Sequence, residues 1–251
     1  MAERRLAVVS GASSGIGAAT AHALADAGFA VALGARRVER LHDVAAAIGP
    51  AASALPLDVT DQASVDAFCA ALDRCDVLVN NAGGAKGLAP VADADDDHWR
   101  WMFETNVMGT MRMTRALLPH LRAGGDGHVI MVGSIAALEP YPGGAGYNAA
   151  KYGVRAMTSV LRQELLGEPV RVTEVDPGMV RTEFSEVRFE GDAARADAVY
   201  AGMTPLSAED VAACIAFAAT RPPHVNIDSM LVMARDQYGA QRVHRRDRGG
   251  S

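Results

Sequence analysis

Seven short apolar runs alternate with longer helix-patterned stretches, and this alternation constrains the fold more than any other feature of the chain. Most of these runs are continuously apolar rather than alternately apolar and polar, which is typical of parallel strands covered on both faces. The pattern predicts an α/β fold with a doubly wound parallel sheet of about seven strands and helices on both faces. The runs cover residues 6–9, 30–33, 53–56, 77–79, 129–132, 170–175 and 230–233.

Size and composition favour a single domain. A chain of 251 residues with 49% apolar residues can bury one large core. We expect one domain over residues 1–246 and a flexible C-terminal tail at 247–251. The formal charge of -6 offers no basic surface for nucleic acid. No apolar segment approaches the ~20 residues needed to cross a bilayer, so we expect a soluble, cytoplasmic protein.

A glycine-rich turn follows the first apolar run and leads into the apolar helix-patterned stretch 18–27. Glycine lets a backbone approach a pyrophosphate closely, and a helix N-terminus presents unpaired amides to it. Between a strand and a helix, the pattern indicates a dinucleotide site rather than merely a tight turn. The expected contacts are Gly11, Ser13, Ser14, Gly15, Ile16 and Gly17.

The cofactor preference is predicted from the end of the second run. An NAD-selective site would place an acid there for the adenosine ribose, but this chain has Arg36 and Arg37. Two arginines suit a 2′-phosphate, so we predict NADP(H). The alternative is a solvated helix start that includes Glu39 and Arg40. Further along the chain, we expect residues 58–59 to border the adenine and residues 80–83 to support the cofactor. These are Asp58, Val59, Asn80, Asn81, Ala82 and Gly83.

Tyr147 and Lys151 are the candidate catalytic pair. Hydride transfer at a carbinol carbon needs a group that exchanges the hydroxyl proton, and a phenol near a lysine ammonium and an oxidised nicotinamide meets that need. Their spacing of four residues puts both on one face of a helix. Ser134 would bond the substrate oxygen, and Asn106 would hold a water that links Lys151 to solvent. Taken singly, Tyr147 and Lys151 also suit an ordinary surface helix.

Other chemistries fit the chain less well. Residues 93–97 are acidic and precede His98, but adjacent carboxylates on a helix point in different directions, so we interpret them as a helix start and predict no metal site. The residues around Ser134 do not match the elbow of a serine hydrolase. The stretch 178–203 lacks a clean period and carries Phe184 and Arg188, so we expect an active-site lid.

These motifs together resemble the short-chain dehydrogenase/reductase family over essentially the whole chain. The resemblance implies a Rossmann-type homotetramer, with Asn106, Ser134, Tyr147 and Lys151 as the catalytic tetrad. It also adds Pro177, Gly178, Val180 and Thr182 to the cofactor contacts, as it does Tyr147 and Lys151.

Within that family the chain is most similar to the NADP-dependent 3-hydroxy acid dehydrogenases of the L-serine and malonic semialdehyde types. The similar passages are 182–192, 223–227 and 243–246. Such substrates carry a carboxylate, for which Arg188 is the candidate partner, with a subunit interface as its alternative role. Tyr141 and Phe184 would shape the substrate pocket beside Ser134 and Tyr147. The last arginines, Arg245 and Arg246, would reach another subunit.

Two other functions stay open at the level of sequence. One is a short-chain reductase of a specialised-metabolism aldehyde or ketone, similar to clavaldehyde reductase, because fold likeness does not choose a substrate. The other is a non-catalytic NADPH-binding sensor, which would have no need of Tyr147 and Lys151 together.

Overall fold

The computed structural model describes residues 4–246, and a seven-stranded sheet forms the centre of this part of the chain. Neighbouring strands are parallel, in the order β3-β2-β1-β4-β5-β6-β7. The predicted doubly wound fold is confirmed, and each predicted run matches one strand to within two residues at either end. The expected tail at 247–251 lies outside the described residues. The strands are β1 (Leu6–Ser10), β2 (Ala30–Ala35), β3 (Ala52–Pro56), β4 (Val77–Asn80), β5 (Gly127–Val132), β6 (Val170–Pro177) and β7 (Ser229–Val232).

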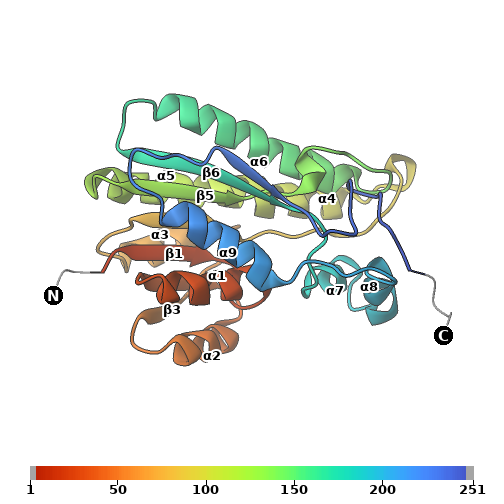
Figure 1. Cartoon of the computed structure of the whole chain (residues 1–251), viewed down its shortest axis with the longest axis horizontal. Helices are drawn as coiled ribbons and strands as arrows, with labels where there is room; N and C mark the ends of the chain where they lie inside the picture. Colours follow the sequence, from red (N-terminus) through yellow and green to blue (C-terminus); the bar gives the residue numbers. More distant parts are fainter. Residues whose placement is uncertain (1–3, 247–251) are drawn as a thin grey trace.

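Helices cover both faces of the sheet (Figure 1). On one face lie α1 (Gly15–Asp26), α2 (Val38–Ile48) and α9 (Ala208–Ala219). On the other lie α3 (Gln62–Ala70), α5 (Gly109–Ala123) and α6 (Ala145–Glu164), with α4 (Asp96–Phe103) packed on α6. Among residues 4–246, no helix is both long and apolar enough to span a membrane.

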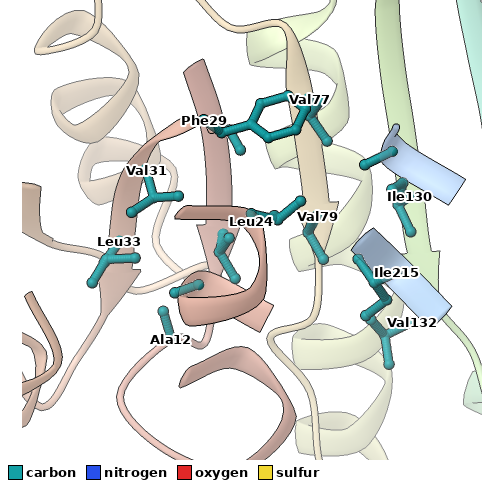
Figure 2. Close-up of a cluster of buried hydrophobic side chains, with 14 of the residues drawn as sticks. Ala12, Leu24, Phe29, Val31, Leu33, Val77, Val79, Ile130, Val132 and Ile215 are labelled. Atoms are coloured by element: carbon teal, nitrogen blue, oxygen red, sulfur yellow. The ribbon is translucent and has the colours of Figure 1, made fainter. Parts of the chain in front are cut away.

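The sheet lies between two hydrophobic cores, and this explains why most strands are continuous apolar runs in the sequence. In β1, Val9 joins the core under α1 and α9, whereas Val8 joins the core under α3, α5 and α6. Successive strand residues point to opposite faces, so a strand buried on both faces must be apolar at every position. Figure 2 shows the first core, where Leu24 of α1 and Ile215 of α9 lie over the strand residues.

The strand order places a crevice at the centre of the sheet. From β1 the chain builds outward through β2 and β3, and it then returns to place β4 on the opposite side of β1. Loops leaving β1 and β4 therefore diverge at their carboxyl ends, which is where open α/β sheets bind ligands. The glycine-rich turn predicted from the sequence follows β1 at this point.

The stretch expected to form a lid contains two short helices, α7 (Phe184–Arg188) and α8 (Ala193–Val199). With 5 and 7 residues, each is too short to display a helical period, which is why the stretch 178–203 lacks a clean period in the sequence. The Tyr200 hydroxyl donates to Val180 O at 2.8 Å and lies 2.8 Å from Ser185 Oγ. Figure 1 shows both helices at the end of the molecule where the C-terminal segment finishes.

The C-terminal segment of the same chain fastens this lid. Arg245 donates to Val199 O at 3.0 Å and also to Ala201 O, just beyond α8. Arg246 pairs with Asp236 at 2.7 Å. A cation at a helix C-terminus interacts favourably with the helix dipole, so Arg245 stabilises α8. The predicted contact of these arginines with another subunit stays a prediction.

Candidate active site

A cavity of about 580 Å³ lies at the carboxyl ends of the central strands. Its walls come from the turn after β1, the ends of β2, β5 and β6, the loops after β3 and β4, helix α6 and the lid. Most of the site residues expected from the sequence line this one cavity, including both arginines after β2 and Arg188 in the lid. Within the described chain, Gly17, Asn80 and Asn106 are not among the lining residues. Those that are comprise Gly11, Ser13, Ser14, Gly15, Ile16, Arg36, Arg37, Asp58, Val59, Asn81, Ala82, Gly83, Ser134, Tyr141, Tyr147, Lys151, Pro177, Gly178, Val180, Thr182, Phe184 and Arg188.

The turn after β1 has the geometry that an anionic ligand requires. Gly11 has φ +68°, in the left-handed region that favours glycine. A Cβ on Gly17 would lie 2.3 Å from Gly11 O, so only glycine lets α1 pack this closely on the turn. No side chain of the described residues caps the N-terminus of α1. Its first amides and its dipole therefore face the cavity, and they fit a pyrophosphate.

The loop after β4 is fastened to that turn by Ser10 and Asn81. Ser10 Oγ accepts from Asn81 N at 3.1 Å and from Ala82 N at 3.0 Å. Asn81 Nδ2 donates to Ser10 O at 3.0 Å. The neighbouring Asn80 is buried and donates to Thr114 Oγ1 at 2.9 Å, so it ties β4 to α5. These bonds hold the two loops at the crevice in a fixed relation.

The two arginines after β2 have different surroundings. All three nitrogen positions of the Arg37 guanidinium are engaged: Nη1 donates to Glu183 at 2.7 Å, Nη2 to Ser14 at 2.6 Å and Nε to Ser13 at 3.2 Å. The Arg36 side chain is exposed, and among residues 4–246 no hydrogen bond or ion pair engages it. Arg36 is therefore the group whose full set of donors is available to a ligand.

Asp58 lies beside this arginine at the cavity wall. Burial raises the pKa of its carboxyl, but hydrogen bonds from Thr60 and the charge of Arg36 lower the pKa below its usual value. Asp58 Oδ1 accepts from Thr60 N at 2.9 Å and from Thr60 Oγ1 at 2.7 Å. The loop after β3 is thus held in place by its own side chains.

Tyr147 and Lys151 lie on one face of α6, as their spacing predicts, and both are buried. Lys151 Nζ is 5.8 Å from the centroid of the Tyr147 ring and donates to Val132 O at 2.9 Å. Ser134 follows β5, and its hydroxyl accepts from Ala136 N at 3.1 Å. Because that bond uses a lone pair, the hydroxyl proton of Ser134 can be donated to the Tyr147 oxygen or to a ligand.

Burial governs the ionisation of the pair. It raises the pKa of Tyr147, as does the neighbouring Tyr141, while hydrogen bonding to Ser134 and the charge of Arg188 lower the pKa. Burial also lowers the pKa of Lys151 to about 8, although the charges of Asp176 and Glu174 raise it. In the protein alone Tyr147 is therefore a neutral phenol, which suits a proton donor. The lysine ammonium and the oxidised nicotinamide expected from the sequence are the charges that would lower the pKa of this phenol.

Two buried acids beneath this pair were missed by the sequence analysis. Asp176 Oδ1 accepts from Ser134 N at 2.9 Å. Glu174 and Asp176 lie 3.4 Å and 3.5 Å from Arg155 Nη1. A Cβ on Gly133 would lie 2.1 Å from Asp176 Oδ1, so glycine is required beside the acid. Two carboxylates two residues apart in one strand were the signal that could have identified them.

Arg188 brings a cation close to Tyr147. Its Nη1 donates to Tyr141 Oη at 2.9 Å and its Nε donates to Gly87 O at 3.0 Å. The guanidinium carbon is 5.9 Å from the centroid of the Tyr147 ring. Phe184, at the other end of α7, also packs on this tyrosine, with its ring centroid 5.5 Å from that of Tyr147. A guanidinium has five N–H donors, so several remain for a ligand.

Asn106 lies in a π-helical turn, Glu104–Met108, between α4 and α5. Its Nδ2 donates to Gly84 O at 2.8 Å and to Met102 O at 2.7 Å, and its Oδ1 accepts from Gly84 N at 3.2 Å. The side chain therefore fixes the loop after β4 to this turn. The predicted water between Asn106 and Lys151 stays a prediction.

The acidic segment before His98 caps and begins α4. The side chain of Asp95 caps the helix by accepting from His98 N at 2.9 Å. Asp96 and Asp97 pair with Arg100 at 2.9 Å and 3.0 Å. This is the helix start that the sequence predicted.

Comparison with known proteins agrees with this geometry. The family model described as short chain dehydrogenase matches residues 5–193. An uncharacterized oxidoreductase of Mycobacterium tuberculosis is 61% identical over 239 residues, which cover 95% of this chain and 94% of that protein. An NADP-dependent 3-hydroxy acid dehydrogenase of Schizosaccharomyces pombe is 42% identical over 248 residues, covering 95% and 96%. A solved structure, the closed form of serine dehydrogenase complexed with NADP+, has a TM-score of 0.91 and 38% identity, covering 96% of this chain and 100% of that one.

Proposed function

Since the chain belongs to the short-chain dehydrogenase family, as its motifs predict, we propose that it is an NADP(H)-dependent oxidoreductase of small 3-hydroxy acids and 3-oxo acids. The observation that carries this proposal is the placement of Arg188 beside Tyr147 in the cavity that the glycine turn also lines. One end of that cavity offers Arg36 and uncapped helix amides to a phosphorylated dinucleotide. The other end offers a guanidinium to a carboxylate, next to a proton donor.

The residues around Tyr147 support carbonyl reduction. A bound nicotinamide would supply the hydride. Ser134 and Tyr147 would hold the substrate oxygen, and Tyr147 would donate its proton to that oxygen as the carbonyl is reduced. The Lys151 ammonium would stabilise the phenolate left behind, and Arg188 would hold the carboxylate so that the carbonyl meets Tyr147. Oxidation of the hydroxy acid uses the same contacts in reverse.

We expect Arg188→Met to distinguish acid substrates from neutral ones. Kinetics with 3-hydroxypropionate and with its methyl ester compare a charged substrate with a neutral one that is larger by a methyl group. A charge-assisted hydrogen bond contributes about 1.5–3 kcal/mol, so kcat/KM for the acid falls about 10- to 100-fold while that for the ester changes little. Arg195→Met, an exposed arginine on α8, is the matched control. Equal losses on both substrates would exclude the carboxylate role and favour the specialised carbonyl reductase.

We expect Asp176→Asn to move the alkaline limit of carbonyl reduction to lower pH. The Lys151 ammonium is present below its pKa of about 8 and is lost above it, and the charge of Asp176 raises that pKa. Removing this charge lowers the pKa of Lys151, so kcat declines at a lower pH than in the wild type. The profile is measured between about pH 6 and pH 10. Asp97→Asn on the surface is the control, and an unmoved or upward-shifted limit for Asp176→Asn would contradict the assignment.

We also propose that the enzyme works as a homotetramer in the cytoplasm, as its family resemblance implies. Exposed apolar side chains on three elements supply surface for subunit contacts: Val160 on α6, Phe217 on α9 and Leu231 on β7.

A further inference from the structure

Glu183, at the start of the lid, joins two arginines of the cofactor end. Its Oε2 lies 2.7 Å from Arg37 Nη1 and its Oε1 lies 2.6 Å from Arg40 Nη1. Arg37 follows β2, and Arg40 lies in the first turn of α2. One carboxylate thus bridges two cations that are more than 140 residues away in the sequence. No role was expected for it from the sequence.

Glu183 also stands between two residues of the cavity wall. Thr182 packs against the glycine turn, because a Cβ on Gly15 would lie 3.2 Å from the Thr182 side chain. Phe184 packs on Tyr147. Arg37, in turn, donates to Ser13 and Ser14 of the glycine turn. A continuous line of contacts therefore runs from the glycine turn through Glu183 to the catalytic tyrosine.

We propose that Glu183 is a positioning residue whose ion pairs with Arg37 and Arg40 hold the lid closed over the cavity. Closure keeps Phe184 against Tyr147 and keeps Arg188 beside the substrate position. The expected effect on kcat rests on the proposed function. The closure itself does not, because it involves residues of this chain alone. Glu183 is negative and lies near the expected 2′-phosphate site, so its removal also relieves repulsion of that phosphate. Catalysis and NADPH binding therefore respond differently to its loss.

Hydrogen exchange of the enzyme without ligands tests the closure. We expect Glu183→Gln to raise amide exchange in residues 184–200 about fivefold, because partly exposed ion pairs contribute only modestly to local stability. Peptides of β5 and α5 provide the internal reference and keep their wild-type exchange. The matched control is Glu186→Gln on α7, since within the described chain the exposed Glu186 side chain forms no hydrogen bond or ion pair. We expect the lid of the Glu186→Gln variant to exchange at the wild-type rate.

Arg40→Gln provides a double-mutant cycle with Glu183→Gln. If the two residues act through one bridge, the double variant opens the lid far less than the sum of the two single effects predicts. High salt screens exposed ion pairs, so exchange of the wild-type lid rises toward that of Glu183→Gln at about 1 M NaCl. Additive effects of the two substitutions would contradict the bridge.

Kinetics and NADPH binding then separate positioning from cofactor contact. We expect Glu183→Gln to lower kcat about three- to tenfold, while the Kd for NADPH, measured by its fluorescence, is unchanged or lower. Unchanged lid exchange overturns the proposal, and so does a raised Kd at unchanged kcat, which would mean that Glu183 only orients Arg37. Failure of the hydroxy acid assignment would leave the exchange result intact, so the two ideas fail separately.

Discussion

We expect Tyr147→Phe to lower kcat for carbonyl reduction about 10³-fold, within the range that proton transfer by a positioned side chain contributes. The substitution removes the phenolic proton and preserves the ring that packs on Phe184. Binding of NADPH should weaken far less than kcat falls, because the phenolic proton acts on the substrate oxygen and Tyr147 is only one of many expected cofactor contacts. Steady-state kinetics and NADPH fluorescence measure the two quantities.

Tyr152→Phe is the matched control for this result. Tyr152 lies on the same helix, α6, and its hydroxyl donates to Leu138 O at 3.1 Å, outside the cavity. The Tyr152→Phe variant also loses a phenolic hydroxyl, but one outside the cavity, so its kcat should remain near that of the wild type. If Tyr147→Phe retained more than about a tenth of the wild-type kcat, another group would have to donate the proton.

The second large effect concerns cofactor choice. We expect Arg36→Asp to lower the ratio of kcat/KM for NADPH to that for NADH about 100-fold or more. The change removes a charge-assisted contact that contributes about 1.5–3 kcal/mol and places an acid against the 2′-phosphate. The same acid can accept from the ribose hydroxyls of NADH, so efficiency with NADH is maintained or improved.

Arg36 is the position to change because the guanidinium of Arg37 is already engaged by Glu183 and two serines. The ratio acts as its own control, since any general damage to the enzyme lowers both efficiencies together. An unchanged ratio would assign Arg36 to the solvated start of α2 and exclude it from the phosphate site.

The sheet could be predicted because strands that are buried on both faces carry apolar residues at successive positions. Val8 and Val9 face opposite cores, so the run must be apolar throughout, and the same holds for the run 77–79 in β4. Tyr147 and Lys151 were predictable because four residues make one helical turn. Where burial or local spacing determines the structure, the sequence alone is sufficient.

The remaining features depend on contacts between distant segments. Glu183 reaches Arg37 across 146 residues, and Asp176 reaches Ser134 across 42. Neither contact can be predicted from the residues that flank these positions in the sequence. Helix α7 is stabilised by packing in the lid rather than by a period of its own, and Asn106 is fixed by a π-helical turn with no sequence signature. These are features that only the folded chain reveals.

The measurement that tests the central proposal most directly is an initial-rate survey with NADP+ and NAD+. The substrates are L-serine, 3-hydroxypropionate, L-allo-threonine and a neutral secondary alcohol. We predict a strong dependence on NADP+ and a preference for the hydroxy acids over the neutral alcohol. Activity with the neutral alcohol alone would retain the reductase mechanism and reject the hydroxy acid assignment. Binding of NADPH without turnover of any carbonyl or alcohol would contradict the account as a whole.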